Sequence, residues 1–174
     1  MNGFMITLLL MSAFSLSSYS QDLSTHNIAR VLNVLSEKEE GWKGNEVVIS
    51  SKSNGSIQIK KSEGGYGFTK EGKQAWSYGF GFCTVASESM CSEGLGSFRI
   101  RNGQLYLRHY GDEMIVKVLE SLPAKFTYSL IENTPEGKRT HTIQLQLSKS
   151  KTFIHYKTVR LNGQLEWASV FHGK

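Results

Sequence analysis

The sequence predicts a mainly β protein, an antiparallel meander that forms a barrel or a strongly curved half-barrel, with one N-terminal α-helix. Three observations predict this fold. Runs in which apolar and polar residues alternate recur from Glu46 to the C-terminus, as expected for strands with one buried face. The dipeptide Asn-Gly, a strong hairpin signal, occurs three times between these runs. Helical periodicity occurs before Glu46 and is not repeated after it.

The first residues have the pattern of a secretory signal peptide. The segment from Phe4 to Leu16 is predominantly apolar but too short to span a bilayer, and the small residues Ser18 and Ser20 precede Gln21. We therefore expect residues 1–20 to be a signal peptide that is cleaved near Ser20, and residues 21–174 to form a single β-barrel-like domain. The protein would then be secreted or periplasmic, with no transmembrane span in the mature chain.

The one predicted helix follows this segment. Four apolar residues recur at the spacing of a single helical face, namely Ile28, Val31, Leu32 and Leu35. We expect the helix to run from about Ser24 to Lys38, and Gly41 to stop it. Its apolar face should lie against the sheet or plug one end of it.

The stretch from Ala75 to Cys83 alternates large and small residues without a break. Strand geometry places four aromatic residues on one face, namely Trp76, Tyr78, Phe80 and Phe82. The opposite face carries Ser, Gly, Gly and Cys. Two interpretations are open from the residues alone. The aromatic face is either part of a filled core or the wall of an apolar pocket.

The three Asn-Gly dipeptides predict hairpins whose register follows from the apolar pattern. A two-residue loop at Asn102-Gly103 pairs Ile100 with Leu105 and Phe98 with Leu107. For the first hairpin, a three-residue loop from Ser53 to Gly55 pairs Ile49 with Ile59. For the last hairpin, a loop from Leu161 to Gly163 pairs Val159 with Leu165 and Lys157 with Trp167.

Further strands are predicted from Met114 to Leu119, from Phe126 to Ile131 and from Thr140 to Leu147, giving about nine or ten strands. A turn around Pro135 joins the last two runs. The glycine-rich segments 64–67 and 94–96 are interpreted as turns, since neither precedes a helix that would bind phosphate.

Two architectures accommodate such a meander. One is a closed barrel that is lipocalin-like in shape, and the other is a helix-capped half-barrel that is lipoprotein-carrier-like in shape. Both are likenesses of shape alone, because no family motif is identified. The Gly-x-Trp signature of lipocalins is absent, since Trp42 directly follows Gly41.

Cys83 and Cys91 are the two cysteines of the chain. In an exported protein they predict a disulfide that closes a short loop. On the chain-entropy model such a bond stabilises the fold by about 2 to 3 kcal/mol. The spacing does not fit a redox-active or metal-binding pair.

The formal charge is +5, spread over short Lys and Arg pairs. This diffuse pattern argues against nucleic acid as a partner. His109 and His141 share strand parity with apolar residues and should point inward near strand ends. They lack the spacing of a metal site or a carboxylate partner for acid–base work. No catalytic motif, metal site or cofactor is predicted, so an enzyme is the less favoured class.

Two functions are compatible with these features. The first is an exported, non-enzymatic binding protein that holds an apolar small molecule or a lipid in a curved β-sheet pocket. Its predicted ligand-binding residues are Trp76, Tyr78, Phe80, Phe82, His109 and His141. The alternative is an envelope or extracellular interaction module with a solid core, which binds a protein or glycan through its loops and polar sheet face.

Overall fold

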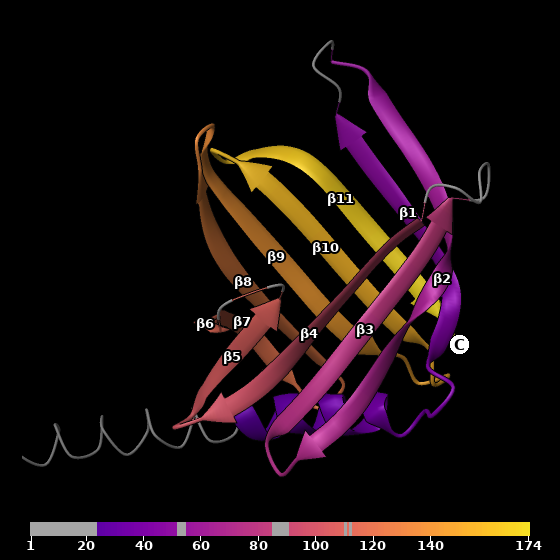
Figure 1. The fold of residues 1–174 in the computed structure, drawn as a ribbon, viewed down its shortest axis with the longest axis vertical. Helices are drawn as coiled ribbons and strands as arrows, with labels where there is room; N and C mark the ends of the chain where they lie inside the picture. The colour runs from indigo at the N-terminus through magenta and orange to yellow at the C-terminus, as the bar shows by residue number, and fades with distance from the viewer. Residues whose placement is uncertain (1–23, 52–54, 85–90, 110, 112) are drawn as a thin grey trace, which may run out of the picture.

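The computed structural model describes residues 24–51, 55–84, 91–109, 111 and 113–174, so the predicted signal peptide lies outside the described residues. One helix and a single eleven-stranded antiparallel sheet form a nearly closed barrel (Figure 1). This confirms the predicted fold class. The strands are β1 (Trp42–Ser51), β2 (Ile57–Gly72), β3 (Ala75–Thr84), β4 (Cys91–Arg101), β5 (Gln104–His109), β6 (Glu113–Ile115), β7 (Lys117–Leu122), β8 (Lys125–Thr134), β9 (Gly137–Leu147), β10 (Phe153–Leu161) and β11 (Gln164–Gly173).

The sheet curls because the first and last strands pair with each other. Its order is β6-β5-β4-β3-β2-β1-β11-β10-β9-β8-β7, so the two edges are β6 and β7, which are neighbours in sequence. The chain crosses from one edge to the other at Val116, whose amide donates to the Leu105 carbonyl at 3.1 Å. The single strand predicted from Met114 to Leu119 is therefore wrong, because its two parts pair with β5 and β8 on opposite sides of this break.

Two of the three predicted hairpin registers are confirmed. Ile100 pairs with Leu105 across the Asn102-Gly103 turn, and Ile49 pairs with Ile59 in the first hairpin. Residues 52–54 of the first loop lie outside the described residues, and Gly55 has a φ of 78°. In Figure 1 this hairpin of β1 and β2 projects beyond the rest of the barrel.

The predicted register of the last hairpin is wrong. Its loop is the two residues Asn162 and Gly163, with φ angles of 50° and 86°, as a type I′ turn requires. A bulge next to Val159 then absorbs one extra residue. Val159 consequently pairs with Trp167, and Lys157 pairs with Ser169.

The two glycine-rich segments are strands, not the expected turns. Residues 64–67 belong to β2 and residues 94–96 belong to β4. A Cβ atom at Gly64 would collide with the backbone of β3 at Gly81. Glycine is needed here because the strands of a strongly curved sheet approach each other closely, and this explains its presence within a strand.

The helix of residues 24–36 lies across one end of the barrel (Figure 1) and ends two residues before the predicted end. Its four predicted apolar residues have no exposed surface. Two indoles from the sheet bind the helix, since Trp42 Nε1 donates to the Leu35 carbonyl at 3.0 Å and Trp76 Nε1 donates to Asn33 Oδ1 at 3.1 Å. The helix thus plugs the barrel, as the sequence predicts. No helix of the described residues is long and apolar enough to cross a membrane.

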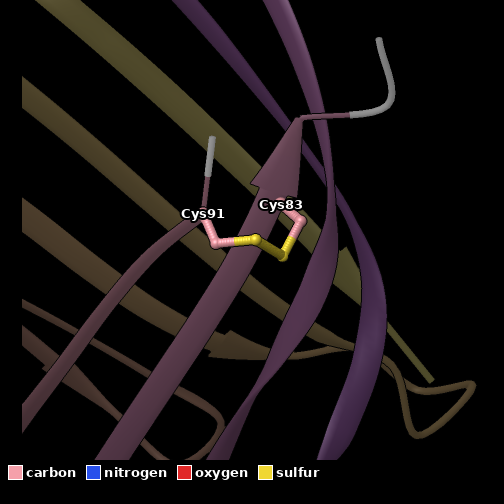
Figure 2. The surroundings of a disulfide bond; sticks show 2 residues. All are labelled: Cys83 and Cys91. Atoms are coloured by element: carbon pink, nitrogen blue, oxygen red, sulfur yellow. A yellow bond between two sulfur atoms is a disulfide. The ribbon is translucent and has the colours of Figure 1, made fainter. Parts of the chain in front are cut away.

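The predicted disulfide is confirmed. Cys83 and Cys91 are directly opposed at the ends of β3 and β4, with their Cα atoms 4.0 Å apart (Figure 2). Trp76, at the other end of β3, contacts the helix. The disulfide therefore lies at the end of the barrel that the helix leaves open.

Candidate functional site

The interior of the barrel is filled near the helix and hollow near the opposite end. The hollow part is a cavity of about 680 Å³, lined by side chains from every strand except β7. The filled part consists mostly of aromatic rings and the apolar face of the helix. The cavity is the candidate site because it is the place where side chains from many strands converge on open space.

The alternating strand β3 supplies one wall of this cavity. Tyr78, Phe80 and Phe82 line the cavity, whereas Trp76 is fully buried beneath the helix in the filled part. The aromatic face is therefore both core and cavity wall, in different halves of the same strand. Of the six residues predicted to bind a ligand, these three and both histidines line the cavity, and Trp76 does not. Their role in binding remains a prediction.

Two histidines in the cavity are paired with tyrosines. Tyr78 Oη and His109 Nδ1 share a hydrogen bond of 3.2 Å, and Tyr66 Oη and His155 Nδ1 share one of 3.1 Å. Burial lowers the pKa of His109, and burial together with the charge of Lys157 lowers the pKa of His155 to about 3. Both imidazoles are thus neutral near pH 7 and act as hydrogen-bonding groups.

His141 belongs to a charged network at the rim of the cavity. Its Nε2 lies 3.3 Å from Glu132 Oε2, and the Arg139 guanidinium lies 3.8 Å from the same carboxylate. Arg139 also donates to both oxygens of Glu166, at 2.8 and 3.0 Å. Burial lowers the pKa of His141, while the hydrogen bond to Glu132 raises it. These contacts join strands β8, β9 and β11.

A second charged pair lies deeper in the cavity. Burial raises the pKa of the Glu46 carboxyl, and a hydrogen bond from Ser169 and the charge of Lys157 partly offset this effect. Burial also lowers the pKa of the Lys157 ammonium, while the charges of Glu46 and Glu132 raise it. The two groups influence each other without forming a direct ion pair.

Sequence reasoning missed Glu46, Tyr128, His155 and Lys157, which all line the cavity. A usable signal was present in β10, where Phe153 and Val159 are apolar residues of the same parity. Side chains alternate along a strand, so His155 and Lys157 must share their inward face. Ile154 is an apolar residue of the opposite parity, so the inward face of this strand was not fixed from the residues alone.

The described part of the chain brings together no three side chains that could hold a metal ion. What the cavity offers is an aromatic wall, several neutral hydrogen-bonding groups and two inward ammonium groups, Lys60 and Lys157. No family model matches this sequence, and comparison with curated proteins finds no significant match. The function must therefore be argued from the cavity.

Proposed function

We propose that this protein is a non-enzymatic binding protein that holds an apolar or amphipathic small molecule, or a lipid chain, inside its barrel. The observation that carries the proposal is the cavity of about 680 Å³. This volume falls within the roughly 300 to 1,000 Å³ typical of small-molecule sites. The plugging helix makes a closed floor, so a ligand would enter from the opposite end.

The aromatic wall supports an apolar ligand. Phe80 is only half-buried in the protein and borders the cavity, so part of its ring has no packing partner. A ligand that covers this surface gains roughly 25 cal/mol for each Å² of apolar area removed from water. The signal-peptide pattern supports an exported binding protein, secreted or periplasmic.

The experiment fills the cavity with a side chain. Val48 lines the cavity, and the next residue, Ile49, is 42% exposed on the outer face of the same strand. We expect the neutral fluorescent probe N-phenylnaphthylamine to bind the wild-type mature protein. Val48→Trp should abolish its binding, whereas the control Ile49→Trp should keep it.

Circular dichroism and thermal unfolding check that each variant is folded. Val48→Phe, a smaller insertion, should give an intermediate affinity and is a fallback if Val48→Trp does not fold. Absence of probe binding by the folded wild-type protein would refute the proposal, as would equal affinities of the two Trp variants. Native mass spectrometry of protein from its host would then show whether a ligand is carried.

An interaction module is the second candidate, and one feature favours it. The outer face of the β1–β2 hairpin exposes Ile49, Ile57 and Ile59, of which Ile57 is 71% exposed. An exposed apolar strand pair favours a protein partner over a glycan. A second copy of the chain is the simplest partner to test. Sedimentation of the wild type and of an Ile57→Ser, Ile59→Ser variant would show association that depends on the hairpin.

A further inference from the structure

Lys157 stands within a row of inward side chains that crosses six strands. The strand registers align Lys60, Val48, Ser169, Lys157, Ile143 and Tyr128. The two direct neighbours of Lys157 in this row, Ser169 and Ile143, carry no charge. Its ammonium group lies 4.9 Å from the centroid of the Trp167 ring. It forms no ion pair with any described carboxylate.

The two carboxylates that act on Lys157 electrostatically have other partners. Glu46 accepts a hydrogen bond from Ser169, and Glu132 contacts Arg139 and His141. The Lys157 ammonium group is therefore a charged donor in the cavity for which the described residues supply no acceptor. Such a group is costly to bury unless an acceptor reaches it.

Tyr128 supplies a second donor of the same kind. Its side chain is 4% exposed and lines the cavity. No described residue forms a hydrogen bond with its hydroxyl group. Burial raises its pKa well above 10, so the hydroxyl keeps its proton. Tyr128 lies two strands from Lys157 in the row, which places their backbones about 10 Å apart with both side chains directed inward.

We propose that the ligand of this cavity is an amphiphile with an anionic head group, which accepts hydrogen bonds from Lys157 and Tyr128. Its apolar part lies against the aromatic wall formed by Tyr78, Phe80 and Phe82. This inference rests on the proposed binding function and adds the charge and the orientation of the ligand. A carboxylate, a sulfonate or a phosphate has the required chemistry.

The test compares two probes that share one aromatic body. N-phenylnaphthylamine is neutral, and anilinonaphthalene sulfonate carries an added sulfonate group. Lys157→Met should weaken binding of the sulfonate probe about tenfold or more, because a hydrogen bond to a charged group is lost. The neutral probe should bind within about twofold of wild type, because its contacts are apolar. Tyr128→Phe should weaken the sulfonate probe by a smaller factor.

Two variants serve as controls for charge and for folding. Lys61→Met removes the same charge from the exposed outer face of β2, and it should leave both affinities unchanged. Lys157→Arg keeps the charge and should retain most of the affinity for the sulfonate probe. Competition by decanoate, decyl phosphate and decanol then distinguishes the head groups, since the two anions should displace the sulfonate probe and the alcohol should not.

The outcomes separate the two proposals. Equal weakening of both probes by Lys157→Met, or equal loss of sulfonate binding in Lys61→Met, would overturn the anionic ligand and leave the binding function standing. If neither probe binds the folded wild-type protein, the binding function fails and the anionic ligand fails with it.

Discussion

The two halves of the barrel are built from the same strands but use their inward residues differently. Near the helix, β3 contributes Trp76 and β10 contributes Phe153, both without exposed surface. Near the open end the same strands contribute Phe80 and Lys157, which border the cavity. The helix supplies the apolar surface that completes the first half. A strand can thus carry core at one end and the wall of a cavity at the other.

The difference in packing has a direct energetic consequence. In the filled half, aromatic rings contact one another in series, as Phe153 does with Trp42, Phe68 and Phe171 at centroid distances of 5.6 to 5.8 Å. In the hollow half, Phe80 contacts the rings of Tyr66, Phe82 and His109 but also borders the cavity and is only half-buried. Most of the folding free energy should therefore reside in the filled half.

The largest expected effect tests this inference with one substitution in each half. Phe98→Ala removes a ring that is 2% exposed and should lower the free energy of unfolding by about 3 to 5 kcal/mol. Phe80→Ala removes a half-buried ring and should cost about 1 to 2 kcal/mol. Urea denaturation of both variants measures the difference. Equal losses would show that the hollow half is packed as tightly as the filled one.

The fold was largely predictable because its signals are local. The helix follows from the spacing of Ile28, Val31, Leu32 and Leu35, and the middle hairpin follows from Asn102-Gly103 with its apolar pairs. The glycines of β2 and β4 misled the prediction because strand curvature depends on neighbouring strands, which the local sequence does not show. The predicted strand from Met114 to Leu119 is divided because its first part pairs with β5 and its second part pairs with β8. This pairing is likewise not visible in the local sequence.

The site was only partly predictable for a related reason. Alternation placed Tyr78, Phe80, Phe82, His109 and His141 on inward faces, and all five line the cavity. Alternation does not show where along a strand the filled core ends and the cavity begins. Trp76 was therefore predicted to bind the ligand together with these five residues, although the helix covers it. Lys157 was missed because β10 carries apolar residues on both faces, such as Phe153 and Ile154, so alternation alone did not fix its inward face.

The second prediction concerns pH. His155 has a pKa of about 3 in the folded protein, against the ordinary value of 6.5. Between these values the unfolded chain binds a proton that the folded protein does not, so stability falls as the pH falls from 6.5 towards 3. The two pKa values set an upper bound of about 2 kcal/mol on the free energy of unfolding that is lost between pH 7 and pH 5. Solvent in the cavity makes the actual loss smaller.

Replacing His155 by Phe should remove this contribution and make the stability less sensitive to acid. His109 and His141 have lowered pKa values and act in the same direction, while Glu46 has a raised pKa and acts against them. Tyr66 and Lys157 also face His155.

The measurement is urea denaturation at pH 7 and pH 5, with His172→Phe as an exposed control. An unchanged pH dependence in the His155 variant would mean that the imidazole is well solvated.

The smallest expected effect concerns the hydrogen bonds that stabilise the open end of the barrel, where no filled core is present. Asn162, in the turn between β10 and β11, accepts a hydrogen bond from the Lys138 amide at 3.0 Å and donates one to the Glu136 carbonyl at 3.2 Å. These bonds tie two neighbouring turns together at the rim. Hydrogen bonds between turns thus stabilise this end of the barrel, whereas apolar packing stabilises the other end.

Asn162→Ala should lower the free energy of unfolding by about 1 to 2 kcal/mol, since it removes these bonds and places alanine at a φ of 50°. Asn162→Gly removes the same bonds but tolerates the backbone angle, so it should cost about 1 kcal/mol or less. Chemical denaturation of the two variants separates the backbone cost from the cost of the lost bonds. If both variants are as stable as wild type, strand pairing alone stabilises the rim. The packing of the filled half would then determine the shape of the cavity, because the same strands run through both halves.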